Sequence, residues 1–321
     1  MDGDLIGVDL GGTKVAVARL EGHGLGAVDT APTERESADG LIEQIVAAIE
    51  RVRGEGVSAV GVGVPSVVEF ATGRAKSSVN VPLRDVPLGQ VLRERLDLPV
   101  YVDNDGTCAA LAEAHEGGQL VTEDLVMFGV GTGVGGGIVL GGRPYRGRTG
   151  AAGEFGHWLV GADLELGAPP AGAFPQAGSL EAYARGGVLD DMAAAAAVAE
   201  PRSALGRRAA EQGAVRGRDA VEAAKEGDEA SRRLIELIGE RLGIGIANAI
   251  NAFDPEVVAV GGGVSAAGDL LLAPARSAAL RFVLPGVGEE TEIRLARHGA
   301  DAGLLGAALL ARQELAVEAT A

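Results

Sequence analysis

Two acidic stretches in the sequence carry residue types that phosphoryl transfer needs. In the first, Asp9 stands near the end of the apolar run Leu5–Leu10, directly before Gly11-Gly12-Thr13-Lys14. A carboxylate in an otherwise buried strand is costly unless it has a partner, and a hydrated Mg²⁺ on a nucleotide is such a partner. A plain β-hairpin with a solvated turn fits this stretch equally well, so both interpretations stay open.

The second acidic stretch is Asp103-Asn104-Asp105, which follows the apolar run Pro99–Val102. In α/β folds, ligands collect at the carboxyl ends of strands. A carboxylate there can accept the proton of a substrate hydroxyl while that oxygen attacks a phosphoryl group. The competing interpretation is a solvated turn in which an aspartate caps the next helix.

Three glycine clusters each follow an apolar strand: Gly11-Gly12, Gly131–Gly137 and Gly261–Gly263. Such glycines let backbone amides approach an anion closely, so together they favour a nucleoside triphosphate. A Walker A motif is excluded because Thr13 precedes Lys14. The spacing Gly131-x-Gly133-x-x-Gly136 matches a dinucleotide fingerprint, but it continues into an apolar strand rather than a helix, so a hairpin is the better interpretation.

The elements that must position these residues alternate between strand and helix, which predicts an α/β fold. Helical spacing predicts helices over 41–52, 88–96, 107–115, 179–185, 192–210, 219–226, 231–252, 269–282 and 303–315. Two strand–glycine turn–strand units, at 5–18 and 125–140, open the two halves of the chain. This duplication predicts two related domains, residues 1–116 and 117–302, with a ligand cleft between them.

Composition limits the partners. The chain has 321 residues, which suffices for two domains, and a formal net charge of -17, which argues against nucleic acid. Its single cysteine excludes a disulfide framework. The sequence shows no signal segment and no apolar run long enough for a bilayer, so we expect a soluble, cytoplasmic protein without a membrane partner.

Six segments, in order along nearly the whole chain, resemble the ROK family of sugar kinases and repressors. This family lies within the actin-like, hexokinase-like ATPase superfamily. The segments that carry the resemblance are Gly7–Lys14, Asn80–Pro82, Asn104-Asp105, Gly131–Gly137, Gly153–His157 with Gly178–Glu181, and Asn251–Val258 with Gly261–Gly263.

The resemblance implies a two-domain fold with a nucleotide and sugar cleft between the domains, and a helix at 303–321 that packs back on the first domain. It implies ATP and Mg²⁺, with Asp105 as general base and Asp9 holding Mg²⁺ through water. The residues implied to surround the nucleotide are Asp9, Gly11, Gly12, Thr13, Lys14, Gly131, Thr132, Gly133, Gly262 and Gly263. Those implied to read sugar hydroxyls are Asn80, Asn104, Glu154, His157 and Glu181.

The sequence departs from the family at a zinc site. The family usually builds it from a histidine, here His157, and three cysteines, whose positions fall on Gly172, Phe174 and Ser179. One histidine cannot form a tetrahedral zinc site, so we expect no structural zinc. The irregular stretch 160–177 must then be held by packing, for which Leu164, Leu166 and Phe174 are the obvious anchors.

The implied activity is ATP-dependent phosphorylation of a hexose, with glucose as the first candidate. Fructose, mannose or an N-acetylhexosamine as substrate, or polyphosphate as donor, remain open. A non-catalytic sugar-binding regulator is the alternative of another class, although it would not need Asp105. The stretch Leu5–Lys14 contains the segment that resembles the family's first phosphate motif, and only Met1–Asp4 precede this stretch. We therefore expect no DNA-binding domain. The resemblance also suggests a homodimer or homotetramer.

Overall fold

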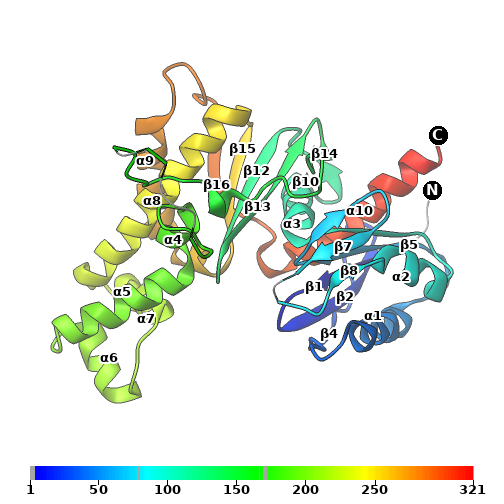
Figure 1. Cartoon of the computed structure of the whole chain (residues 1–321), viewed down its shortest axis with the longest axis horizontal. Coiled ribbons are helices and arrows are strands. Elements are labelled where there is room, and N and C mark those ends of the chain that lie inside the picture. The colour runs from blue at the N-terminus through cyan, green and yellow to red at the C-terminus, as the bar shows by residue number, and fades with distance from the viewer. Residues whose placement is uncertain (1–3, 79, 166, 169–171, 321) are drawn as a thin grey trace. The chain divides into compact units, whose positions relative to one another are not determined.

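The computed structural model describes residues 4–78, 80–165, 167–168 and 172–320. The chain forms two compact units (Figure 1). Unit 1 contains residues 1–125, 137–153 and 297–321, and unit 2 contains residues 126–136 and 154–296. The predicted domain boundaries, 1–116 and 117–302, stay a prediction. Within the described residues, no helix has the length and apolar character that crossing a bilayer requires.

Unit 1 is built on a sheet with the strand order β3-β2-β1-β5-β9, in which β4 also pairs with β2. The strands are β1 (Asp4–Leu10), β2 (Lys14–Glu21), β3 (Gly24–Leu25), β4 (Asp29–Pro32), β5 (Val57–Val64) and β9 (Val100–Asn104). β1 and β2 form the antiparallel hairpin that the first motif predicts. β1, β5 and β9 run parallel, so their carboxyl ends share one edge, and Asp9, Gly63 and Asp103 lie in one row across it.

Alternating side chains give this sheet two different faces. Ile6, Val8 and Leu10 belong to a core cluster with the helices α1 (Ala38–Val52) and α2 (Leu88–Leu96). Leu5 and Ala59 belong to a second cluster with α3 (Asp105–Glu113) and α10 (Ala302–Glu318). Successive side chains of a strand point to opposite faces of the sheet, and helices cover both faces, so both sets of side chains are buried.

Glycines on the second face let α10 lie directly on the strands. A Cβ atom at Gly61 would fall 1.7 Å from the Ala307 carbonyl oxygen, and one at Gly7 would fall 2.2 Å from that of Leu304. On the opposite side of the helix, a Cβ atom at Gly306 would fall 1.7 Å from the Cys108 oxygen in α3. α10 is therefore fixed between the sheet and α3 by backbone-to-backbone contact.

The remaining elements of the first 125 residues are short. The strands β6 (Val67–Glu69), β7 (Arg74–Ser77) and β8 (Arg84–Val86) form a small sheet. Its strands are too short and too polar for an alternating pattern to be visible. β10 (His115–Glu116) and β11 (Gln119–Leu120) form a two-stranded hairpin.

A further sheet has the order β14-β13-β12-β15-β16. It contains the second predicted strand–glycine turn–strand unit. Its strands are β12 (Leu125–Val130), β13 (Val134–Leu140), β14 (Arg143–Pro144), β15 (Val257–Gly261) and β16 (Glu292–Leu295). In unit 2, Phe155 packs on Phe128 and Trp158, with ring centroids 4.8 and 4.7 Å apart.

The helices of unit 2 are α4 (Leu180–Ala184), α5 (Gly186–Ala199), α6 (Ala204–Gln212), α7 (Gly217–Lys225), α8 (Glu229–Phe253) and α9 (Asp269–Phe282). The bounds of α9 are those predicted. A single helix over 192–210 is wrong, because the chain breaks at 200–203 around Pro201 and Ser203 caps a new helix. Gly243 of α8 packs closely on α9, because a Cβ there would be 2.4 Å from the Ala275 oxygen.

We predict that Gly61→Ala lowers the free energy of unfolding by about 3 kcal/mol, because the added methyl group forces α10 away from β5. Gly24→Ala is the matched control, since a Cβ there meets no atom within 4 Å. Urea denaturation measures both. Equal stability of the two variants would contradict the proposed role of the close contact.

Candidate active site

Asp105 lies at the first position of α3, immediately after β9. Asn104 caps this helix, since its Oδ1 accepts hydrogen bonds from the backbone N–H groups of Gly106 (2.9 Å) and Thr107 (3.2 Å). Asp105 Oδ1 also accepts from Gly106 N, at 2.9 Å. The Asp105 side chain keeps some contact with solvent, yet burial among protein atoms raises the pKa of its carboxyl group. A carboxylate with a raised pKa is suited to accept a proton.

Asp9, near the end of β1, is a second carboxylate of this sheet edge. Burial, and then the negative charge of Asp105, raise the pKa of Asp9 to about 6, while Lys14 acts in the opposite direction. The first turn of α10 lies against it, because a Cβ at Gly303 would be 2.9 Å from Asp9 Cγ. Two carboxylates that repel each other are suited to a cation, so this donor set fits a magnesium ion held through water by Asp9.

The turn Gly11–Lys14 is short and tightly held. Gly11 N donates to Lys14 O at 2.8 Å. Thr33, which the sequence analysis did not single out, donates from Oγ1 to Gly11 O at 2.8 Å and from its N–H to Thr13 O. Asn80 lies beside the turn, since a Cβ at Gly12 would be 3.0 Å from the Asn80 Cβ. Unit 1 thus brings together the predicted residues of the first phosphate motif, Asn80 and the two carboxylates.

Most hydrogen-bonding groups of the Asn104 side-chain amide are already used by bonds within the protein. Besides the cap, its Nδ2 donates to Ser66 O at 3.3 Å. The predicted contact of Asn104 with a sugar hydroxyl stays a prediction, and it would have to use the second N–H of this amide.

In unit 2, the glycine loop 131–134 lies beside the glycines after β15. A Cβ at Gly131 would be 4.0 Å from Gly263 N. Gly262 has φ 85°, and a Cβ there would fall 2.4 Å from Val130 O, so only glycine fits. The glycines of loop 131–134 and those after β15, which the resemblance implies to surround the nucleotide, therefore lie side by side in unit 2.

The predicted sugar-reading residues of unit 2 also gather around this loop. Glu181 Oε2 accepts a hydrogen bond from Val134 N at 2.8 Å. Glu154 and His157 lie across a 3_10 turn (Phe155–His157), 3.8 Å apart between Oε2 and Nε2, and are 50% and 42% exposed. The His157 ring contacts the Phe174 ring edge-on, with centroids 5.1 Å apart.

The zinc positions hold no metal ligands in the described residues. Ser179 is fully buried and its hydroxyl caps α4 by accepting from Ala182 N, while Phe174 contacts His157. No group of three or more His, Cys, Asp or Glu side chains suited to a metal occurs within the described part of the chain. These residues do not fit zinc, and the absence of the metal stays a prediction.

The predicted anchors of the stretch 160–177 are wrong in two cases. Leu164 and Phe174 are 63% and 71% exposed, and Leu166 lies outside the described residues. Backbone bonds hold the ends instead, with Val160 N donating to Gly178 O and Leu180 N to Trp158 O, both at 2.8 Å. The sequence offered no signal for these bonds, because backbone groups look alike in every residue.

A buried ion pair, also missed by the sequence analysis, supports the strand that leads to Asp105. Asp103, 1% exposed, accepts from Arg146 Nε at 2.6 Å and from Asn104 N at 2.9 Å. The Arg146 guanidinium stacks on the Phe70 ring at 3.5 Å and lies 3.4 Å from Glu314. Burial raises the pKa of Asp103, and Arg146 opposes that shift.

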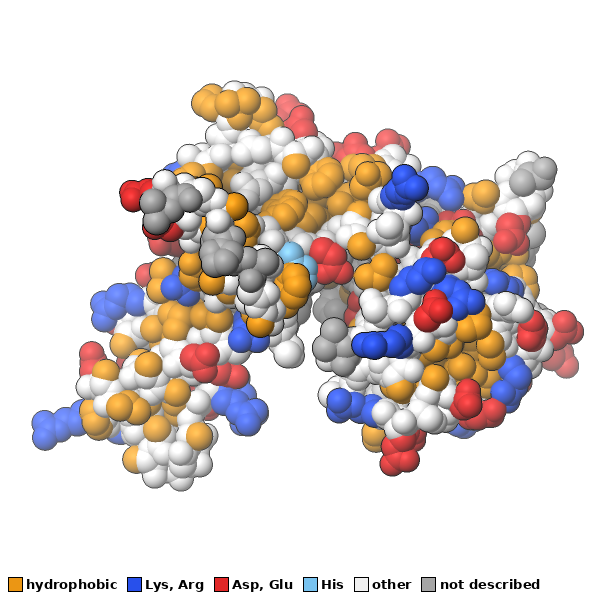
Figure 2. All heavy atoms as spheres, viewed as in Figure 1, with side chains coloured by type: hydrophobic (Ala, Val, Ile, Leu, Met, Phe, Trp, Pro, Cys, Tyr) orange, Lys and Arg blue, Asp and Glu red, His pale blue; other side chains and the backbone are white. Residues whose placement is uncertain are grey.

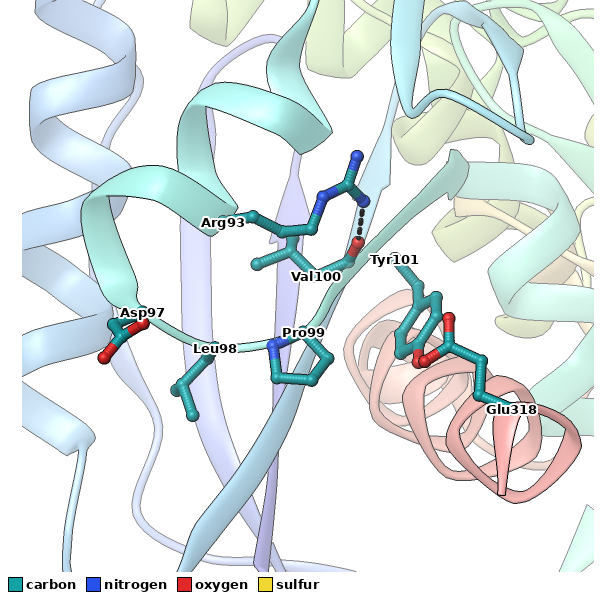
Figure 3. A pocket seen from close by; sticks show the side chains of 7 residues that line it. All are labelled: Arg93, Asp97, Leu98, Pro99, Val100, Tyr101 and Glu318. Carbon is teal, nitrogen blue, oxygen red and sulfur yellow. Dashed lines mark hydrogen bonds between the residues drawn. The ribbon is translucent and has the colours of Figure 1, made fainter. Parts of the chain in front are cut away.

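A pocket of about 360 Å³ in unit 1 lies at the other end of β9 (Figure 3). Arg93, Tyr101 and Glu318 line it, and Arg93 donates to Val100 O at 2.8 Å. Because the pocket is at the start of the strand and Asp105 follows its end, the pocket is separate from the candidate site.

The model of the ROK family matches residues 5–314. The fold therefore belongs to the two-domain sugar kinase ATPase class, and the chain belongs to the ROK family. The glucokinase of Halalkalibacterium halodurans is 35% identical over 96% of this chain and 95% of its own length. The N-acetyl-D-glucosamine kinase of Shigella flexneri is 32% identical over 95% and 98%.

The structure is similar to that of a ROK family glucokinase from Streptomyces griseus in complex with glucose and AMPPNP. The TM-score is 0.78 at 34% identity, with 97% of this chain and 100% of that chain covered.

We predict that Asp9→Asn stabilises the magnesium-free protein at pH 7.5. A pKa of about 6, above the usual 3.8, means that the folded state disfavours the charged form. Asp9 therefore weakens folding progressively as the pH rises from 4 to 6, by up to about 3 kcal/mol. Thermal unfolding should show the variant more stable at pH 7.5 and the difference lost near pH 4. A variant that is less stable at pH 7.5 would contradict the predicted shift.

We predict that Arg146→Met lowers the free energy of unfolding by about 3 kcal/mol, because it leaves the Asp103 carboxylate buried without its cation. Adding Asp103→Asn to the same chain should recover part of the loss. Arg95→Met, at the exposed pair of Arg95 with Glu43, is the control and should cause no measurable change. If urea denaturation gives the same result for Arg146→Met and Arg95→Met, the ion pair does not stabilise unit 1.

Proposed function

We propose that the chain is an ATP-dependent hexose kinase, with glucose as its first candidate substrate. The observation that carries this proposal is Asp105, a carboxylate with a raised pKa at the end of β9, beside Asp9 and the first glycine turn. The similarity to two kinases of hexose sugars and to a structure with glucose and AMPPNP supports it.

In the proposed reaction, Asp105 accepts the proton of the sugar hydroxyl as its oxygen attacks the γ-phosphorus of ATP. The bond from that phosphorus to the β-γ bridging oxygen breaks, and ADP leaves. Asp9 would hold Mg²⁺ through water, and the ion would neutralise negative charge on the phosphates. The residues that would surround the phosphates are those that the family resemblance implies: Thr13, Lys14, Gly131, Thr132 and Gly133.

Two alternatives differ in substrate and in class. An N-acetylhexosamine kinase is supported by the relative from Shigella flexneri, and small differences near Asn80, Glu154 and Glu181 would decide between the sugars. A non-catalytic sugar-binding regulator would not need a base, so the position of Asp105 argues against it.

We predict that Asp105→Asn lowers kcat at least about a hundredfold, while sugar affinity changes little, because the amide cannot accept the proton. A coupled ADP-release assay over glucose, fructose, mannose and N-acetylated hexosamines, repeated with polyphosphate as donor, measures it. Asp97→Asn, at the C-cap of α2 where φ is 51°, is the control, since asparagine tolerates that conformation.

Near-normal turnover of Asp105→Asn would refute the assignment of the base. Absence of turnover by the unmodified protein with every sugar and both donors would favour the regulator.

A further inference from the structure

Two helices hold the glycine loop 131–134, one at each of its ends. Glu181, in the first turn of α4, accepts the Val134 N–H through Oε2 at 2.8 Å. Gly186, the first residue of α5, donates its N–H to Gly131 O at 2.7 Å. Gly133 lies between these bonds, and a Cβ there would fall 2.5 Å from Glu181 Oε2. The loop is therefore held by α4 at Val134 and by the start of α5 at Gly131, and all these residues belong to unit 2.

α4 itself is firmly held, so the backbone position from which the Glu181 side chain projects is defined. Leu180 is fully buried, and a Cβ at Gly245 of α8 would fall 2.5 Å from its Cδ2. Arg241 of α8 donates to Tyr183 O at 3.0 Å. Figure 1 shows α4 lying beside α8. These contacts fix the helix, while the half-buried Glu181 side chain keeps rotational freedom that a bound sugar can remove.

The other predicted sugar-reading segment contacts the same loop residue. Gly156 lies between Glu154 and His157, and a Cβ at Gly156 would fall 2.2 Å from Val134 O. Val134 is thus contacted at its N–H by Glu181 and at its C=O by the turn that carries His157. The segments predicted to read the sugar and the loop predicted to hold phosphate form one packed assembly.

We propose that Glu181 couples sugar binding to nucleotide binding within unit 2. One carboxylate oxygen, Oε2, holds the Val134 N–H. The other, Oε1, accepts no hydrogen bond among the residues that the structure describes, and it is available to a sugar hydroxyl. A sugar bound to Oε1 orders the Glu181 side chain and, through the Val134 bond, the glycine loop 131–134. Nucleotide then binds more tightly, because less conformational entropy is lost when it orders the loop. By linkage, nucleotide strengthens sugar binding by the same factor. This inference rests on the proposed kinase function.

Two variants at this position separate the hydrogen bond from the charge. Glu181→Gln and Glu181→Ala both remove the negative charge near the phosphates, but only glutamine keeps an acceptor for Val134 N. We expect the affinity for AMPPNP, measured by calorimetry without sugar, to be about five- to tenfold weaker in Glu181→Ala than in Glu181→Gln. A residue that only reads sugar would leave these two affinities equal.

The coupling itself is measured by repeating the AMPPNP titrations with saturating glucose. In the unmodified protein glucose should strengthen AMPPNP binding, and in Glu181→Ala this factor should fall to about 1. His157→Ala is the matched control, because its ring contacts Phe174 and accepts no bond from the loop. This variant should bind glucose more weakly, and its affinity for AMPPNP in the absence of sugar should stay within twofold of that of the unmodified protein. Circular dichroism checks that each variant is folded.

Equal AMPPNP affinities of folded Glu181→Ala and Glu181→Gln, or an unchanged coupling factor, would overturn the inference while leaving the kinase proposal intact. An unmodified protein that neither binds nor phosphorylates any sugar would instead overturn the proposed function.

Discussion

The close contact of α10 with two neighbours controls the arrangement of unit 1. Gly7 and Gly61 on the sheet and Gly306 on the helix leave no space for a methyl group. The distance from the sheet to the helix is therefore set by backbone atoms, which do not adapt as side chains do. The first turn of α10 then reaches Asp9, and α3, which begins with Asp105, packs on the far side of the helix. The positions of both carboxylates follow from where glycine allows a helix to lie.

The same sheet edge holds acidic side chains with opposite electrostatic solutions. Asp103 shares its row with Asp9, yet Asp103 is paired with Arg146 and hydrogen-bonded. Asp9 and Asp105 have no such cation at hydrogen-bond distance among the described residues, although burial raises the pKa of all three carboxyl groups. The paired carboxylate of Asp103 stabilises the fold. Carboxylates without a cation, such as Asp9 and Asp105, are candidates for binding a ligand that brings positive charge or a proton. On the face shown in Figure 2, Lys and Arg side chains are interspersed with Asp and Glu.

Much of the fold could be read from the sequence, because apolar periodicity and glycine turns are local signals. The helices over 88–96 and 269–282 have the predicted bounds, and the strand before Asp105 was predicted within two residues. The hairpin at Asp9 was also predicted, although its second strand continues to Glu21, three residues beyond the predicted end. Parallel pairing of β1, β5 and β9 then explains why Asp9 and Asp105 meet. Contacts between distant residues could not be predicted: Arg146 lies 43 positions from Asp103, and Glu181 lies 47 from Val134. Each of these bonds depends on how the chain between its two partners folds. Neither Arg146 nor Glu181 stands out from the residues around it in the sequence.

The path of the chain has a consequence for biosynthesis. Unit 2 ends at residue 296, whereas unit 1 needs residues 297–321 in addition to its first 125 and the segment 137–153. A ribosome therefore delivers all of unit 2 before it delivers α10. Until then, Gly7, Gly61 and their apolar neighbours on the second sheet face have no helix to cover them. The unit that is begun first is therefore completed last, and one face of its sheet stays exposed to solvent until α10 has been synthesised.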